Sequence, residues 1–299
     1  MKVVIITVIV RFGHSVGVIA HAVPLYEAKM VHQFDHRWAT YVGDTDESRD
    51  MTDEEKADVN RAVQPRYWVE RAGVDARLAD KNWARGWLLG FRDITNATNE
   101  RTTIAGIIPL VGCGNKFPLL LTKNTPPSLI ACLVGNLASI CLDFVARQKI
   151  GGTTMNYFYL KQFPLLHPNN FEGSLKISII QRVLELTYTA NDMKSFYEDV
   201  IAENLAFDPR TGGERGSAWK WNPERRAILR SELDAIYARL YGLTRDDLRY
   251  ILDPSDIMGN DYPSETFRGL KAKEIRHLGE YRTRRLVLEA WDKLEQSEL

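Results

Sequence analysis

The stretch "PSLIACLVGNLASICLDFVARQK", residues 127–149, marks the point where the chain changes character. It is almost wholly apolar at first and turns basic only at its end. Pro127 suits the first turn of a helix, and Gly151 with Gly152 suits its end. The pattern therefore predicts one buried helix, which small and polar residues interrupt too often for a membrane span.

Before this stretch, the sequence predicts mixed structure built from many short elements. Three β-branched or aromatic runs favour strands: "AKMVHQF", residues 28–34, "RYWVE", residues 66–70, and "TTIAGIIPLVGCG", residues 102–114. Between residues 43 and 63 the chain is polar and acidic, which indicates a loop followed by a short helix. Thr52 with Glu55 three residues later forms a capping-box pattern for that helix.

The last third of the chain is predicted to be helical. "NPERRAILRSELDAIYARLYG", residues 222–242, offers Asn222 as N-cap, Pro223 at the first position and Gly242 at the end. A further helix is expected from a capping pair of Thr244 and Asp247, and a final amphipathic helix over residues 279–294. Residues 207–223 are the best linker candidate. The fold class expected is α+β, with a β-rich part followed by a helical C-terminal region.

Composition excludes some functions and leaves others open. The 39 basic residues balance the 39 acidic ones, so any binding to a polyanion has to depend on local patches, such as residues 61–92 and 269–285. Three cysteines without metal-ligand spacing predict neither a disulfide framework nor a zinc site, which fits a cytoplasmic protein. Residues 1–22 imitate a signal peptide, but Arg11 and His14 interrupt the apolar run, so a buried strand is expected. No membrane partner is expected.

The stretch "YEAKMVHQFDHRWATY", residues 26–41, could hold a catalytic metal. An alternative function is therefore a metal-dependent DNA nuclease that uses these side chains: Glu27, Lys29, His32, Asp35 and His36. Against it, no acidic residue precedes Glu27, although such nucleases take a metal ligand from a preceding strand. The aromatic neighbours favour a packed cluster in which Asp35 is tied to Arg37 or to a histidine.

The sequence also gives little support to the hypothesis that this chain is by itself a methyltransferase. "RFGHSVG", residues 11–17, has glycines. It lacks the pattern of a strand followed by a helix that a cofactor-binding loop requires. "NTPPS", residues 124–128, lacks the aromatic residue on which a flipped base would stack. No catalytic residue and no metal site is therefore predicted, and no cofactor is expected in this chain.

Several blocks in a fixed order nevertheless resemble one family. These blocks are "PLYEAKMVHQFDHRWATY", "RYWV", "GFRDITNATNERTTIAGIIP", "FVARQKIGGTTMNYFYLKQFP", "RSELDAIYARLYGLTRDDLRYILD" and "GEYRTRRLVLEAW". Together they resemble the C-terminal portion of large adenine-specific (N6) DNA methyltransferases of type IIG restriction-modification and phage-defence systems. The similarity runs from about residue 23 to the C-terminus.

The resemblance implies a division of the chain and a role. Residues 23–170 correspond to a target-recognition domain and residues 171–299 to a helical C-terminal support region, while the leader of residues 1–22 departs from the family pattern. The catalytic half, which carries S-adenosylmethionine in the family, would belong to a separate methyltransferase domain or subunit. The implied function is recognition of double-stranded DNA, and a nonfunctional truncated remnant is a further alternative.

Two segments carry the side chains that duplex recognition needs. In "GFRDITNATNERT", residues 90–102, small residues alternate with polar ones across an expected connection between strands. In "ARQKIGGTTMN", residues 146–156, polar residues leave the end of the buried helix, and two glycines permit close backbone approach. The DNA-binding candidates are Arg92, Asn96, Asn99, Arg101, Arg147, Gln148, Lys149, Thr153, Thr154 and Asn156. Ion pairs inside the fold, such as Arg92 with Asp93 or Arg101 with Glu100, are the alternative.

Overall fold

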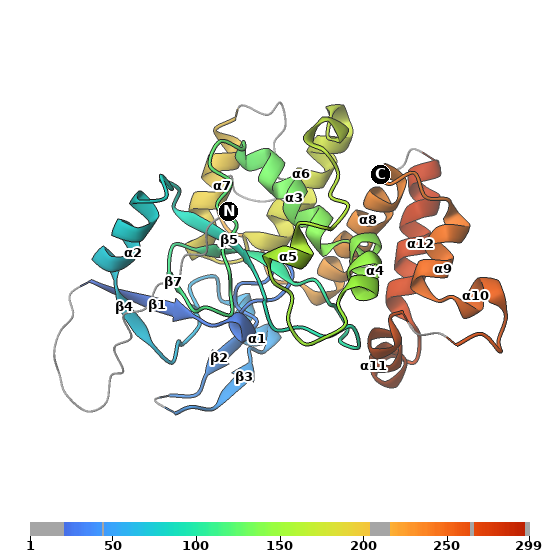
Figure 1. The fold of residues 1–299 in the computed structure, drawn as a ribbon, viewed down its shortest axis with the longest axis horizontal. Coiled ribbons are helices and arrows are strands. Elements are labelled where there is room, and N and C mark those ends of the chain that lie inside the picture. The colour runs from blue at the N-terminus through green and yellow to red at the C-terminus, as the bar shows by residue number, and fades with distance from the viewer. Residues whose placement is uncertain (1–20, 44, 204–215, 264–265, 297–299) are drawn as a thin grey trace. The chain divides into compact units, whose positions relative to one another are not determined.

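The computed structural model describes residues 21–296 apart from 44, 204–215 and 264–265 (Figure 1). Two compact units are present. Unit 1 consists of Met1–Asp93, Ala105–Ile130 and Leu184–Trp221, and unit 2 of Ile94–Ile104, Ala131–Val183 and Asn222–Leu299. Both units draw on segments from either side of residue 170. The strand expected in residues 1–22 lies almost wholly outside the described residues, as does most of the expected linker.

The expected α+β class is confirmed, because all described strands precede the long helices in sequence. The strands are β1 (Ala22–Tyr26), β2 (Ala39–Tyr41), β3 (Ser48–Asp50), β4 (Trp68–Glu70), β5 (Trp87–Phe91), β6 (Ala105–Pro109) and β7 (Gly112–Cys113). The helices are α1 (Asp53–Ala57), α2 (Arg71–Ala79), α3 (Pro127–Ala138), α4 (Ile140–Lys149), α5 (Tyr157–Leu160), α6 (Gly173–Thr187), α7 (Lys194–Ile201), α8 (Pro223–Leu240), α9 (Arg245–Leu252), α10 (Ser255–Met258), α11 (Arg268–Leu278) and α12 (Arg282–Glu295).

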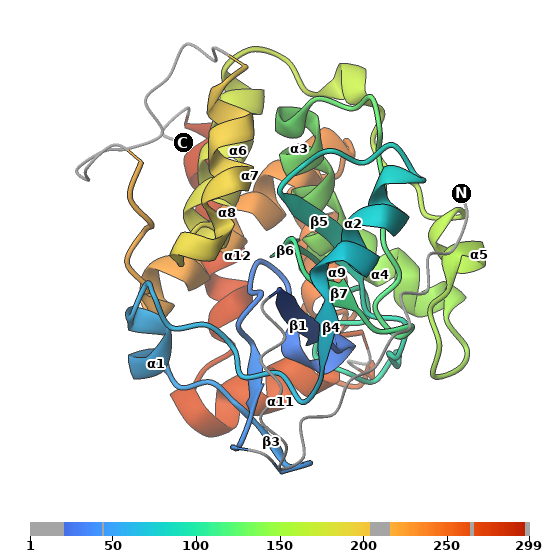
Figure 2. The same ribbon diagram turned by 90° about the vertical axis from the view of Figure 1, so that its left-hand side faces the viewer.

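Unit 1 contains three small sheets. In the largest, β1 lies between β4, to which it is antiparallel, and β7, to which it is parallel (Figure 2). β2 pairs with β3, and β5 pairs with β6 from Trp87 opposite Pro109 to Phe91 opposite Ala105. Two of the three predicted strand runs are confirmed, residues 66–70 in β4 and residues 102–114 in β6 and β7. Residues 28–34 instead begin with a 3-10 helix, Ala28–Met30.

The core of unit 1 is built around Trp87 of β5. Its ring is fully buried and meets the rings of Trp83 and Phe196 edge-on, with centroids 5.5 and 4.9 Å away. The indole Nε1 donates a hydrogen bond of 2.8 Å to Asp199 of α7. A buried indole N–H needs such a partner, so this bond fixes the strand against the helix.

The prediction of a single helix over residues 127–149 is wrong. Two helices, α3 and α4, meet there at a bend of 59°. Ser139 takes an extended conformation and N-caps α4, accepting a hydrogen bond of 3.3 Å from the Leu142 N–H. The carboxylate of Asp234 accepts another of 2.7 Å from the Ile140 N–H. Among the described residues, no single helix has the length and hydropathy of a membrane span, although the bent α3–α4 pair meets that criterion jointly.

Unit 2 is helical, and the predicted caps are confirmed. Asn222 accepts a hydrogen bond from the Arg225 N–H at the start of α8, and Thr244 with Asp247 forms the capping box of α9. α12 lies along α8 and α9 (Figure 1). Their shared core contains Ile140, Cys141, Ala235, Ala238, Leu248, Ile251, Leu252, Phe267, Leu270, Val287, Leu288, Ala290 and Trp291. Ile228 of α8 lies outside this core and is 38% exposed.

Candidate nucleic-acid interface

The two segments predicted to face DNA come together in unit 2 from Ile94 onward, although 43 residues separate them in the sequence. Ile94 and Thr154 form an antiparallel bridge, and the Thr95 N–H donates a hydrogen bond of 3.1 Å to the Thr153 carbonyl. The loop over residues 94–104, which connects β5 and β6, therefore runs beside the loop over residues 150–156, which follows α4. We call the polar residues of these two loops, together with the last two residues of α4, the paired-loop surface. Its members are Asn96, Asn99, Gln148, Lys149, Gly151, Gly152, Thr153, Thr154 and Asn156.

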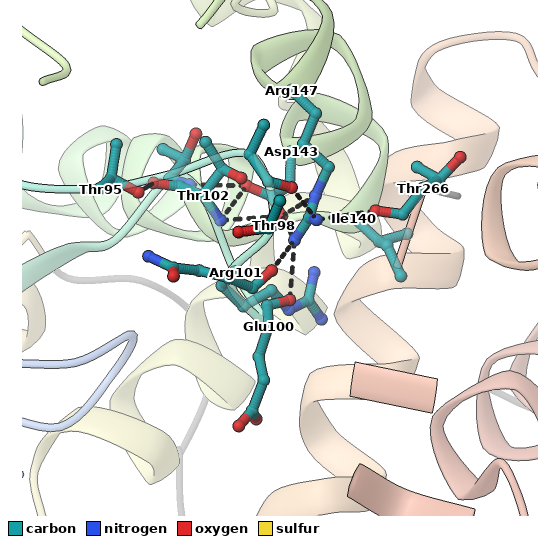
Figure 3. Close-up of polar contacts among 12 residues, drawn as sticks. Thr95, Thr98, Glu100, Arg101, Thr102, Ile140, Asp143, Arg147 and Thr266 are labelled. Atoms are coloured by element: carbon teal, nitrogen blue, oxygen red, sulfur yellow. Dashed lines mark hydrogen bonds and ion pairs between the residues drawn. The ribbon is translucent and has the colours of Figure 1, made fainter. Parts of the chain in front are cut away.

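Arg147 holds the first loop in place from the end of α4. Its Nη1 donates hydrogen bonds of 2.7 Å to the carbonyls of Ala97 and Thr266, and its Nη2 donates bonds of 2.7 and 2.9 Å to those of Asn99 and Glu100 (Figure 3). Burial lowers the pKa of this guanidinium, an effect that the nearby Asp143 carboxylate opposes. Arg147 is only 8% exposed, so the expectation that it contacts DNA is replaced by a structural role.

Asp143, one helical turn before Arg147, binds the other end of the same loop. Its fully buried carboxylate accepts hydrogen bonds from the backbone N–H groups of Thr102 and Thr103, the shortest being 2.9 and 2.6 Å (Figure 3). A buried charge is tolerated only when it is paired and hydrogen-bonded, and both conditions are met here. Two side chains of α4 thus hold this loop, Arg147 at its middle and Asp143 near its C-terminal end.

Arg101 is also turned into the fold. It is 4% exposed and forms an ion pair of 3.2 Å with the equally buried Asp234 of α8. Burial lowers the pKa of Arg101, but the carboxylates of Asp234 and Asp143 outweigh that effect and raise it overall. Burial also raises the pKa of Asp234. The prediction that Arg101 faces DNA is therefore corrected, because a side chain committed to Asp234 lies out of reach of a base edge.

Arg92 belongs to unit 1 and is likewise engaged within it. Its Nε donates a hydrogen bond of 2.6 Å to the Val31 carbonyl, and its Nη2 donates one of 3.2 Å to the Lys29 carbonyl. Burial lowers the pKa of Arg92 to about 10, with Asp50 and Asp35 opposing the change. The expected partner Asp93 instead pairs with Lys116. Arg92 is thus removed from the candidate interface.

The remaining predicted residues lie on the surface. Six of them are exposed: Asn99, Gln148, Lys149, Thr153, Thr154 and Asn156. Asn96 is half-buried, and its side-chain oxygen accepts two hydrogen bonds of 2.9 Å from Thr98, which shapes the turn. Nothing lies within 4 Å of the position that a Cβ would take at Gly151 or Gly152, so their backbone is open to a partner.

Basic side chains of α11 flank the paired-loop surface. Gly269 packs so closely that a Cβ there would lie 3.0 Å from the Thr98 carbonyl oxygen, and Lys273 pairs with Glu100 at 2.9 Å. Arg268 and Arg276, on the same helix, are exposed. Arg268 was not identified from the sequence, because only the fold brings this helix against residues 94–104. By contrast, Arg282, Arg284 and Arg285 of α12 are all paired with carboxylates.

The residues of the alternative nuclease site are used in contacts within unit 1. Glu27 accepts a hydrogen bond from the Tyr41 hydroxyl, and Lys29 lies over the Tyr41 ring. His36 pairs with Asp192 at 2.9 Å, while Asp35 binds Lys56 at 2.7 Å and the Arg37 N–H at 2.9 Å. Asp35 thus contacts Arg37 through the Arg37 backbone N–H, and it forms an ion pair with Lys56 and not with the expected Arg37. In the part of the chain that the structure describes, no three His, Cys, Asp or Glu side chains form a metal-binding group.

Arg37, in the same stretch, has a structural role that the sequence did not reveal. It is fully buried and donates hydrogen bonds of 2.7 to 3.0 Å to four backbone carbonyls, those of Lys56, Asp58, Arg61 and Thr189. Burial lowers the pKa of Arg37, and Asp192 and Asp35 oppose that change. In each unit, therefore, a buried arginine donates hydrogen bonds to several loop carbonyls.

Comparison of the chain with protein-family models, curated proteins and solved structures finds no match.

Proposed function

We propose that this chain is a sequence-specific recognition module for double-stranded DNA, which positions a separate adenine-N6 methyltransferase domain or subunit at its target. The observation that supports this is the pairing of two polar loops through Ile94 and Thr154, which joins separate candidate segments into one surface. The order of sequence blocks that resembles restriction-modification methyltransferases points to the same role. The setting we propose is the cytoplasm.

The paired-loop surface suits direct readout of bases. Amide and hydroxyl groups of Asn99, Gln148 and Thr154 are exposed, and such groups donate and accept hydrogen bonds at base edges in the major groove. Arg147 and Asp143 hold the backbone around Asn99, and the backbone of Thr154 pairs with that of Ile94, so these loops enter a complex already ordered. Preordered side chains lose less conformational entropy on binding, which favours affinity and discrimination.

Exposed cations beside these residues suit the phosphate backbone. Lys149 leaves the end of α4, and Arg268 and Arg276 project from α11. Contacts of this kind supply affinity that falls as salt rises, because each neutralised phosphate releases counterions. They also orient the module on the duplex without reading its sequence.

The chain's own part in methylation is positioning. The partner would carry S-adenosylmethionine and perform the methyl transfer, which requires the adenine to leave the base stack. The residues of this chain would select the site and hold the duplex while that occurs.

The test is selection of bound duplexes from a randomised pool by the purified full chain, over a series of salt concentrations. We expect an enriched sequence motif and an affinity that falls as salt rises. The variants Gln148→Ala and Thr154→Ala are expected to relax the motif at particular positions, with a cost of about 1–3 kcal/mol for each lost base contact. Absence of binding at the lowest salt, or binding without any motif, would refute the proposal for this chain.

A further inference from the structure

Phe158 is an unusual residue for a folded surface. It is 69% exposed, more than any other large hydrophobic side chain among the described residues. It lies two residues after Asn156, at the edge of the paired-loop surface. Ile94 in the first loop is 57% exposed, so the first loop and α5, which follows the second loop, each present one large apolar side chain to solvent.

The backbone that carries Phe158 is well fixed. The Asn156 side-chain oxygen accepts hydrogen bonds of 2.9 and 3.4 Å from the N–H groups of Phe158 and Tyr159. The Gln162 amide donates one of 3.1 Å to the Phe158 carbonyl. The Phe158 ring touches the Tyr159 ring edge-on, with centroids 5.7 Å apart. The exposed ring is therefore a protruding side chain on an ordered backbone.

The charge near Phe158 suits a polyanion rather than an apolar protein partner. Lys149 and Lys161 lie on either side of it in sequence, and both are exposed. Within the described residues, no carboxylate forms an ion pair with either lysine. An apolar docking face would be expected to carry several neighbouring hydrophobic groups, whereas the exposed residues from 151 to 156 are glycine, threonine and asparagine.

We infer that Phe158 is a wedge that inserts into the base stack of the bound duplex. This rests on the proposed function, since it assigns one residue a role on the same DNA-binding surface. Side chains of this type partly unstack a base step and kink the duplex when they insert. The flanking lysines would hold the phosphates on either side of the opened step.

Insertion at this place would assist the partner's chemistry. A base must be unpaired and unstacked before a methyltransferase can act on it, and that step costs free energy. A wedge fixed on the recognition module would meet part of this cost whenever the correct sequence is bound. Recognition and opening of the duplex would then be coupled in one chain.

The experiment compares two duplexes of the selected sequence, one intact and one with a single abasic position, in binding to the full chain. A protein that unstacks bases prefers the abasic duplex, because part of the unstacking is already done. We expect the wild-type chain to prefer it by about tenfold. For Phe158→Ala the preference is expected to fall to about twofold, and Phe158→Trp is expected to retain it.

A second readout is the fluorescence of 2-aminopurine placed at successive positions of the intact duplex. It increases where a neighbouring base is unstacked, so one position is expected to brighten with the wild type and with Phe158→Trp but not with Phe158→Ala. The matched control is Met258→Ala on α10, because Met258 is 57% exposed but lies outside the paired-loop surface. It is expected to behave as the wild type does.

The outcomes separate the wedge from the proposed function. If the wild type binds DNA but Phe158→Ala keeps both the abasic preference and the brightening, the wedge is refuted and the recognition role stands. An equal loss in Met258→Ala would also refute it, because the effect would not belong to Phe158. If the wild type binds no duplex, both proposals fail.

Discussion

The carboxylate of Asp143 and the guanidinium of Arg147, one helical turn apart on α4, form an ion pair in which both Nε and Nη2 lie 3.2 Å from Oδ2. Each group also binds the backbone of residues 94–104, Asp143 through N–H groups and Arg147 through carbonyls. Two opposite charges thus act as matched anchors for one loop. The pair therefore affects stability first and DNA binding only through the loop's shape.

Arg147→Ala is predicted to destabilise the protein by about 3–5 kcal/mol, because it leaves the buried Asp143 carboxylate without its cation and four carbonyls without a donor. Urea denaturation followed by circular dichroism measures the change. Gln148→Ala, at the exposed neighbouring position, is the control and is expected to change stability by no more than about 0.5 kcal/mol. If Arg147→Ala were as stable as the wild type but no longer bound DNA, Arg147 would be assigned to the DNA interface after all.

Lys149→Ala is predicted to reduce the slope of log affinity against log salt by about one, because one phosphate contact is lost. Stability is expected to stay unchanged, since Lys149 is exposed. Lys194→Ala is the control: this exposed lysine on α7 pairs with Glu198 at 3.4 Å and lies outside the paired-loop surface. Equal slopes for the wild type and Lys149→Ala would remove Lys149 from the phosphate contacts.

Gly90→Ala is predicted to destabilise unit 1 by about 1–3 kcal/mol through overpacking. A Cβ at this position would lie 2.4 Å from Cε1 of Phe117, and that ring is buried. Gly73→Ala provides the contrast, because nothing lies within 4 Å of its Cβ position at the third residue of α2. It is expected to stabilise the protein by about 0.5–1 kcal/mol, through the better helix propensity of alanine. Thermal denaturation of the two variants would show opposite shifts, and shifts of the same sign would contradict the packing described.

The Asp192 carboxylate is predicted to stabilise the folded protein at neutral pH and to lose this effect at acidic pH. Burial alone would raise its pKa, but its ion pair and hydrogen bond with His36 and the charge of Arg37 outweigh this, so the pKa of Asp192 is lowered. A carboxylate with a depressed folded-state pKa contributes stability above its unfolded value of about 3.9, and loses it as the pH falls through the folded value. Asp192→Asn is therefore expected to cost about 1 kcal/mol at pH 7 and progressively less below about pH 4.

Urea midpoints for the wild type and Asp192→Asn, measured from pH 7 to pH 3, test this directly. A difference between them that stays constant over the whole range would show that the Asp192 charge has no part in stability. Asp46→Asn is a suitable control, because the Asp46 carboxylate is 59% exposed and its ion pair with Arg66 spans 3.6 Å.

The three cysteines are predicted to be unreactive in the folded protein. All are free and buried, and burial raises the pKa of Cys113 to about 12 and raises that of Cys141 as well. The thiolate is the reactive form, so labelling by a thiol reagent at pH 8 is expected only as the chain unfolds. Mass spectrometry of labelled peptides in increasing urea would report unit 1 through Cys113 and unit 2 through Cys141. Rapid labelling without urea would contradict their burial.

The sequence predicted elements whose signals are local. Capping at Thr52, Asn222 and Thr244 was identified correctly, because an N-cap and its partner lie within three residues of each other. The break between α3 and α4 was missed. It depends partly on Asp234, which lies 94 residues beyond Ile140 in the chain and reaches it only in the folded state.

The candidate site shows the same limit. The sequence selected two loops that prove to be adjacent, but it could not reveal that their arginines point inward. Arg147 is satisfied in part by the carbonyl of Thr266, 119 residues away, and Arg101 by a carboxylate 133 residues away. The sequence alone cannot distinguish an arginine that binds a DNA phosphate from one that binds a backbone carbonyl. Both partners accept hydrogen bonds from the same guanidinium N–H groups.

The division of the chain into two units has a practical consequence for dissecting the protein. The backbone passes from one unit to the other five times, at residues 93/94, 104/105, 130/131, 183/184 and 221/222. A single cut between residues 94 and 221 therefore leaves at least one unit missing a segment. A fragment that stops at residue 170 would keep Arg101 but lose Asp234, leaving that buried arginine without its counterion. Point substitutions, and not gene fragments, are the means by which each unit's contribution can be measured.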